Sequence, residues 1–186
     1  MVFNLYFSNE LTNSYSLNNN YKIYKYSIKK NNDCNIETSF DIDFKKDGHK
    51  KTFGKTLIIG GDQDYLGSIL IAGASALKTG NRYVEILTTE NHSKQIQFNR
   101  PELIVRDSCT ALDNSLDDYS CLLIGPGMSE NEWSLSIFEK IIPILNNNAN
   151  NIPIVADAGF LNLLAEKTFS YKNWILTPHS GEAAKM

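Results

Sequence analysis

Several classes of protein are excluded by what this sequence of 186 residues lacks. No apolar run approaches the roughly 20 residues that are needed to cross a bilayer. The first twenty residues have no basic start, no long apolar core and no small-residue cleavage site, so they do not resemble a signal peptide. The net charge of −3 comes without the basic stripe that is typical of a nucleic-acid binder. We therefore expect neither a membrane nor a nucleic acid as a partner.

Cysteine and histidine are both scarce. The three cysteines are widely spaced and match no metal or redox pattern, which is typical of reduced structural thiols in a cytoplasmic protein. No spacing of histidines with carboxylates or cysteines suggests a transition-metal site, and we expect none. Two of the three histidines, His49 and His92, stand in polar stretches and are interpreted as solvated surface residues.

The composition changes near residue 46. Residues 1–46 are rich in Asn, Lys, Tyr and Ser. Such polar sequence buries little apolar area to offset its ordering entropy, so we expect a partly flexible segment with an edge strand or two in the alternating runs YKIYKYSI and SFDIDF. Residues 47–186 form the second predicted region and read as one domain.

Within that second region, short apolar segments alternate with helix-like ones. Several of the apolar segments are uniform enough to be strands buried on both faces of a sheet. This alternation favours an α/β fold, with a mostly parallel sheet flanked by helices. The predicted strands are 56–61, 83–87, 102–105, 121–125, 152–157 and 174–178.

Two helices have a clear periodicity. Residues 68–80 have Ala and Leu at helical spacing, and Gly80 is a plausible cap at the end. Residues 132–145 predict a second helix, which Pro143 should kink or end. Its apolar face is formed by Trp133, Ile137, Ile141 and Ile144.

Four motifs begin where an apolar strand ends. They are GGDQDYLGS at 60–68, GPGMSEN at 125–131, ADAG at 156–159 and TPHSGE at 177–182. In open α/β sheets, ligands bind outside the carboxyl ends of the strands. Parallel strands would bring all four turns to one rim, and this convergence predicts a ligand site there.

Each motif taken singly also has a structural interpretation. Gly60 and Gly61 could make only a tight turn, or could let a ligand approach the backbone before a helix N-terminus suited to an anion. Gly125 and Gly127 flank a rigid proline and could form only a structural turn, but their backbone without side chains favours contact with a flat ligand. Asp157 could cap the next helix as readily as take part in chemistry.

The TPHSGE motif leaves the same choice open. His179 lies in a turn at a helix start, where it could cap the helix, or could donate to or accept from a ligand's amide or phosphate. Glu182 complements the helix dipole there and needs no ligand to explain it.

The order and spacing of the motifs point to one family. Through HKKTFGKTLIIGGDQDYLGS, NRPELIV, LLIGPGM, ADAGFLNLLA and ILTPHSGEAAKM, residues 49–186 resemble the NAD(P)H-hydrate dehydratases. These are ribokinase-like proteins, often fused behind an epimerase domain. The resemblance implies repair of hydrated NADH and NADPH: ADP or ATP with Mg²⁺ phosphorylates the ring hydroxyl, and loss of phosphate restores the double bond. Catalysis would then be mainly positioning and charge stabilisation.

The resemblance also implies site residues. Ser68 matches a substrate-binding position that is usually Ala, and Gly127 and His179 match substrate contacts in the GPG and TPH motifs. Further motif positions, to which no role is assigned, are Gly60, Gly61, Tyr65, Gly125 and Asp157.

The sequence departs from the family pattern in places. GPGLG appears as GPGMS, with Ser129 for a glycine, and DADAL appears as DAGFL, with Gly159 for the second acid. The GAG after the first helix appears as GNR. The family's nucleotide-binding lysine-glycine segment and its Gly-Asp motif with the catalytic acid both follow TPHxGE, beyond residue 186.

We therefore expect a domain that is incomplete at its C-terminal side, with residues 1–46 as a remnant of a linker to a lost epimerase domain. A complementing C-terminal fragment would be needed for turnover, and an open sheet edge would favour a homo-oligomer. Two other hypotheses remain. The chain could be a degenerate, non-catalytic protein that binds a nucleotide-like ligand, or a ribokinase-like small-molecule kinase.

Overall fold

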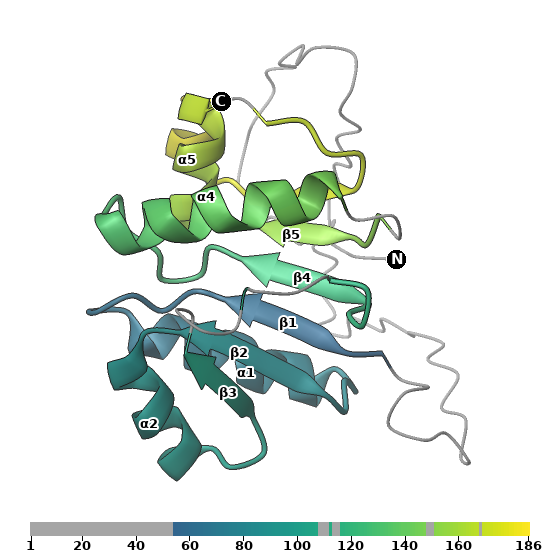
Figure 1. The fold of residues 1–186 in the computed structure, drawn as a ribbon. Coiled ribbons are helices and arrows are strands. Elements are labelled where there is room, and N and C mark those ends of the chain that lie inside the picture. The colour runs from purple at the N-terminus through teal and green to yellow at the C-terminus, as the bar shows by residue number, and fades with distance from the viewer. Residues whose placement is uncertain (1–53, 108–111, 113–115, 148–150, 168) are drawn as a thin grey trace, which may run out of the picture. The chain divides into compact units, whose positions relative to one another are not determined.

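In the part of the chain that the structure describes, six parallel strands form one sheet in the order β3-β2-β1-β4-β5-β6 (Figure 1). The computed structural model describes residues 54–107, 112, 116–147, 151–167 and 169–186. All six predicted strands are present. The predicted boundary at residue 46, the segment before it and His49 lie outside the described residues, and remain predictions. The strands are β1 Thr56–Ile59, β2 Val84–Thr88, β3 Ile104–Asp107, β4 Cys121–Ile124, β5 Ile154–Ala156 and β6 Trp174–Leu176.

Helices connect most of the strands. Gly80 follows α1 with a φ of 99°, and the next backbone N–H, that of Asn81, donates to Ala76 O, so the predicted glycine cap is confirmed. Pro143 lies inside α4, which ends three residues later at Asn146. None of the helices in the described part of the chain is long and apolar enough to span a membrane. The helices are α1 Leu66–Lys78, α2 Glu90–Asn99, α4 Glu132–Asn146, α5 Ala158–Lys167 and α6 Ser180–Ala183.

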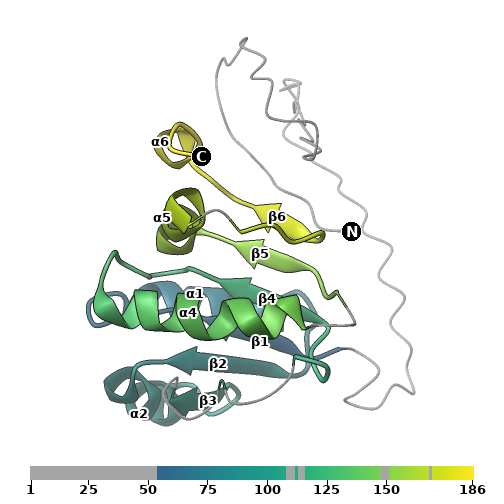
Figure 2. The ribbon, with the colours of Figure 1, turned by 45° about the horizontal axis from the view of Figure 1, so that its top comes forward.

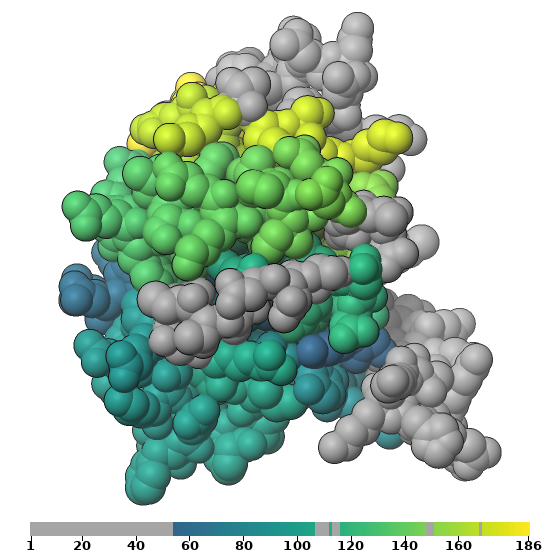
Figure 3. All heavy atoms as spheres, viewed as in Figure 1, coloured from purple at the N-terminus to yellow at the C-terminus, as the bar shows by residue number. Residues whose placement is uncertain are grey.

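The helices cover both faces of the sheet. On one face, Ile69 of α1 and Ile96 of α2 pack against buried residues of β1, β2 and β3. On the other, Ile137 of α4 and Phe160 of α5 pack against β1, β4 and β5. Figure 2 shows α4 in front of the sheet and α1 behind it, and in the space-filling view the green residues of α4 lie across one face (Figure 3). The predicted apolar face of this helix is confirmed, because Ile137 and Ile141 are buried and Trp133 and Ile144 pack partly against the same core.

The strand order reverses between β1 and β4. From β1 the chain winds outward to β2 and β3 through α1 and α2, and from β4 it winds the other way to β5 and β6. The carboxyl ends of β1 and β4 are therefore the switch point of a doubly wound sheet, which is where ligands bind in sheets of this kind. The loops that follow these two strands carry the GGDQ and GPGMSEN motifs.

A buried ionic cluster lies away from this switch point. The carboxylate of Glu85, on β2, is 1% exposed and forms ion pairs with Lys55 Nζ at 2.8 Å and Arg106 Nε at 2.9 Å. Burial alone would lower the pKa of Lys55, but hydrogen bonds to Glu85 and Tyr119 outweigh it and hold that pKa above its ordinary value. Burial, with the hydrogen bond to Glu85, raises the pKa of Tyr119 to about 12.

Candidate functional site

Two loops meet at the switch point and are joined by their backbones. Gly61 N–H donates to Pro126 O at 2.8 Å, and Asp62 N–H donates to Gly127 O at 2.8 Å. The loop after β1 and the loop after β4 therefore form one unit, although more than sixty residues separate them in the sequence.

Asp62 adds side-chain bonds to this junction. The residue is 2% exposed, and its Oδ2 accepts from Ser129 N–H at 3.1 Å and from Asn131 Nδ2 at 2.5 Å. The Asn131 side chain also caps α4 by accepting from Ser134 N–H at 2.9 Å. Asp62 and Asn131 belong to the GGDQDYLGS and GPGMSEN motifs, but neither was predicted to be a site residue. The sequence feature that could have indicated Asp62 is an acidic residue that follows a buried strand and two glycines.

The Gly61 carbonyl is held from the other side. It accepts from Thr88 Oγ1 at 2.7 Å and contacts His92 Nδ1 at 3.0 Å. Because a carbonyl oxygen can only accept, His92 carries its proton on Nδ1. The prediction that His92 is a solvated surface residue was wrong: it is 6% exposed. It lies on α2, a helix that was not predicted from the polar sequence TENHSKQ. Ile96 is the only buried apolar residue of α2, so the helix has no apolar periodicity.

The loop after β5 packs against the loop after β4 through two glycines. A Cβ on Gly125 would lie 1.8 Å from Asp157 O, and one on Gly159 would lie 2.2 Å from Met128 O. No side chain fits at such distances, so the two backbones approach as closely as they do because both residues are glycine. The second acid of the family pattern could not stand at position 159 in this arrangement without a shift of the Met128 backbone.

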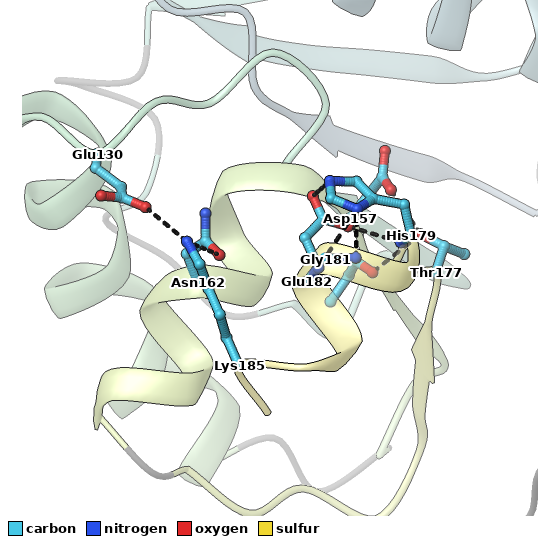
Figure 4. Close-up of polar contacts among 9 residues, drawn as sticks. Glu130, Asp157, Asn162, Thr177, His179, Gly181, Glu182 and Lys185 are labelled. Carbon is cyan, nitrogen blue, oxygen red and sulfur yellow. Dashed lines mark hydrogen bonds and ion pairs between the residues drawn. The ribbon is translucent and has the colours of Figure 1, made fainter. Parts of the chain in front are cut away.

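The fourth motif caps the last helix and ties itself to the third. His179 Nδ1 accepts from Gly181 N–H at 3.0 Å, while Glu182 Oε2 accepts from His179 N–H at 2.9 Å. This reciprocal pair is a capping box at the start of α6. Thr177 Oγ1 donates to Asp157 Oδ1 at 2.7 Å, and Figure 4 shows these four side chains together.

The capping contact fixes the tautomer of His179. Since Nδ1 accepts, the proton of the neutral ring is on Nε2, which lies 3.3 Å from Glu182 Oε1. The His179 side chain is 72% exposed. Its Nε2–H is therefore a donor that a ligand could take over from Glu182.

A cavity of about 560 Å³ opens between these loops. Three of the predicted site residues line it: Tyr65, Ser68 and Gly127. Within the part of the chain that the structure describes, the cavity lining does not include the other five predicted residues, which are Gly60, Gly61, Gly125, Asp157 and His179. Gly61, Gly125 and Asp157 hold neighbouring loops together. His179 lies beside the lining residue Glu182. The remaining lining residues are Met128, Ser129, Glu130, Ala158, Gly159, Asn162 and Glu182.

The lining is about equally polar and apolar, and it carries two carboxylates, those of Glu130 and Glu182. Lys185, just after α6, lies between two lining residues, with its Nζ 3.5 Å from Asn162 Oδ1 and 3.9 Å from Glu130 Oε1 (Figure 4). In the described part of the chain, no group of three or more His, Cys, Asp and Glu side chains could hold a metal ion.

The sequence model of the NAD(P)H-hydrate dehydratase family matches residues 56–186, well over half of the chain. The chain belongs to this family. The match begins with β1 and includes all four loops that surround the cavity.

Known proteins support the assignment. The chain is 34% identical over 143 residues to the bifunctional NAD(P)H-hydrate repair enzyme of Coxiella burnetii. The aligned region covers 76% of this chain and 28% of that enzyme. The ADP/ATP-dependent NAD(P)H-hydrate dehydratase of Bacillus subtilis, co-crystallized with ATP and Mg²⁺, is 30% identical with a TM-score of 0.61, over 76% of this chain and 50% of that one.

A ribokinase-like superfamily protein of Enterococcus faecalis matches with a TM-score of 0.67 and 22% identity, over 75% of this chain and 50% of that protein, which confirms the predicted ribokinase-like α/β fold. The chain thus spans between a quarter and a half of the length of these three proteins.

Proposed function

We propose that this chain supplies the substrate-binding part of a nucleotide-dependent dehydratase that returns (6S)-NAD(P)H hydrate to NAD(P)H. The observation that carries the proposal is the cavity at the switch point. It is lined by Ser68 and Gly127, two of the three positions that the family resemblance assigns to the substrate. The third, His179, stands beside the lining residue Glu182.

The described residues would bind and orient the hydrated nicotinamide ring. Gly127 exposes backbone without a side chain, and Ser68 offers a hydroxyl that can donate or accept. His179 offers Nε2–H, which would leave Glu182 for an amide carbonyl or a phosphate oxygen of the ligand. Holding the ring in one orientation is the main contribution that binding residues make to a phosphoryl transfer.

The donor set is compatible with a magnesium–nucleotide complex. Mg²⁺ is usually held by one or two carboxylates together with nucleotide phosphates, and Glu130 and Glu182 are the carboxylates on the lining. ADP or ATP would supply the phosphoryl group that makes the ring hydroxyl a good leaving group. Glu130 and Glu182 would contact the metal, and the nucleotide itself would be bound by the segments that follow TPHSGE in the family.

The partners follow from the same reasoning. We propose that turnover needs those nucleotide-binding segments, either in one polypeptide with this chain or as a complementing C-terminal fragment. A homo-oligomer through a sheet edge is the second arrangement, because β3 and β6 are the outer strands in the described part of the sheet. A cytoplasmic location remains the expectation from the cysteines.

Ligand binding without turnover is a second candidate function. One observation favours it: Gly159 stands where the family has a second acid, and its packing against Met128 O leaves no room for a side chain. The loss of that acid beside the cavity would affect chemistry more than binding.

Calorimetric titration of the chain with (6S)-NADPH hydrate tests the proposal, with NADPH as the reference ligand. We expect the hydrate to bind more tightly than NADPH, since the added hydroxyl is the feature that the site must recognise. Turnover is measured separately, as recovery of NADPH absorbance with ATP or ADP and Mg²⁺, with and without the C-terminal half of the Bacillus subtilis dehydratase. Binding without turnover in both mixtures would favour the second candidate.

Two substitutions at one position separate the roles of His179. His179→Ala removes both the cap and the imidazole, whereas His179→Asn keeps a good helix cap and removes Nε2–H. We expect both variants to bind the hydrate about tenfold more weakly, which corresponds to one lost hydrogen bond. Normal affinity in His179→Asn would show that the histidine serves only as a cap.

A further inference from the structure

Three donors converge on the Asp62 side chain. Ser129 N–H and Asn131 Nδ2 point to Oδ2, at 3.1 and 2.5 Å, and Asp64 N–H lies 3.5 Å from Oδ1. A carboxylate is the side chain that only accepts, whereas an asparagine would turn an NH₂ group toward one of these donors. The surroundings therefore require an acid at this position, not merely a polar residue of that size.

The buried carboxylate of Asp62 is bonded to uncharged donors and lies near the N-terminus of a helix. Burying a carboxylate is costly unless hydrogen bonds replace its water, and here backbone and amide N–H groups do so. Asn131 is also the N-cap of the 15-residue helix α4, so the carboxylate lies at the positive end of that helix dipole. The surrounding donors thus stabilise a negative charge on Asp62, a residue that is only 2% exposed to solvent.

The same contacts determine where one wall of the cavity stands. Gly127, Met128, Ser129 and Glu130 are consecutive lining residues. Asp62 holds this stretch at both ends, because its N–H donates to Gly127 O and its carboxylate accepts from Ser129 and Asn131. Asp62 itself is not among the lining residues of the cavity.

We propose that Asp62 is a positioning residue for ligand binding: with Asn131, it holds the Gly127–Glu130 wall in the geometry that receives the ligand. The proposal deepens the proposed function and rests on it for the identity of the ligand. Asp62 would contribute through the wall alone, without contacting the substrate.

Hydrogen exchange and calorimetry on the full chain test this together. Asp62→Asn leaves a donor facing donors, and Asn131→Ser removes the amide donor while keeping α4 capped. We expect amide exchange in the segment 125–131 to rise about tenfold in both variants, and hydrate affinity to fall about tenfold, as for the loss of one hydrogen bond. Exchange in β2, part of the core, should stay as in the wild type. Asp64→Asn is the matched control, because it removes an exposed carboxylate two residues away.

An exchanged pair adds a rescue. In Asp62→Asn combined with Asn131→Asp, the amide and the carboxylate trade places and residue 131 can still cap α4, so more than half of the lost protection and affinity should return. Equal exchange over 125–131 in Asp62→Asn and Asp64→Asn would overturn the proposal, as would faster exchange with unchanged affinity. Failure of the wild-type chain to bind the hydrate would instead contradict the proposed function, and the exchange comparison would still decide whether Asp62 holds the wall.

Discussion

The hydroxyl of Thr177 donates to the Asp157 carboxylate at 2.7 Å, and so joins the ends of β6 and β5. Thr177 also reaches Ala156 O with the same hydroxyl, at 3.1 Å. The first residue of TPHSGE is therefore anchored to the ADAG turn by its side chain. This explains how β6, a three-residue strand at the edge of the described part of the sheet, holds His179 at a defined place.

Replacing the Thr177 hydroxyl by a methyl group should weaken this anchor. We expect Thr177→Val to lower the free energy of unfolding by about 1–2 kcal/mol, because a hydrogen bond to a half-buried carboxylate is lost. Thr177→Ser keeps the hydroxyl and is the control for the loss. Urea unfolding measures both, and equal stability of the Val variant and the wild type would mean that the bond contributes nothing.

The cavity itself can be tested by filling it. Ser68 lines it from α1, and a Cβ on Gly127 would lie 3.0 Å from the Ser68 Cβ, so space is short between these two walls. We expect Ser68→Leu to lower hydrate affinity at least tenfold while the chain stays folded by circular dichroism, because the larger side chain would occupy the ligand's volume. Ser75→Leu makes the same change at an exposed position of the same helix and should bind as the wild type does. Undiminished binding in the Ser68 variant would place the ligand elsewhere.

The strands of the sheet could be predicted because each one is marked by a short run of neighbouring residues in the sequence. Runs such as CLLI and TLII are apolar throughout, which is typical of strands buried on both faces, and each is followed by its glycine motif. Because the strands pair in parallel, their carboxyl ends lie at one edge of the sheet, and the motifs that follow them are brought together there. The sequence-based helix assignments were less complete: α2 has a single buried apolar residue, Ile96, and no periodicity could reveal it.

The residues that hold the loops together were harder to predict than the residues that form them. Asp62 and Asn131 interact across a sequence separation of 69, and His92 reaches Gly61 across 31. Such contacts depend on register and strand order, which a single sequence does not reveal. The polar neighbours of His92 indicated solvent, whereas the fold buries it.

The ionic cluster around Glu85 should contribute to stability through its buried member. Glu85→Gln leaves Lys55, whose side chain is 21% exposed, without its carboxylate, and we expect the free energy of unfolding to fall by about 2 kcal/mol, less than for a fully buried pair. Glu90→Gln breaks the exposed pair with Lys94, in which the side chains are 68% and 74% exposed, and should leave stability unchanged. Denaturant unfolding of both variants gives the comparison, and equal values would mean that burial of Glu85 adds nothing to its ion pairs.

Tyr119 should make the fold sensitive to alkaline pH. Burial and the hydrogen bond to Glu85 raise its pKa to about 12 from 10.0, so the unfolded chain releases the phenol proton at a lower pH than the folded chain. Stability from this group is full below pH 10 and falls as pH rises toward 12, because there the unfolded state binds fewer protons. Tyr119→Phe removes the titrating group, so its unfolding free energy should decline less over this interval than that of the wild type. Urea unfolding of both proteins from pH 9 to 11.5 measures the two slopes, and parallel slopes would mean that Tyr119 does not titrate differently on folding.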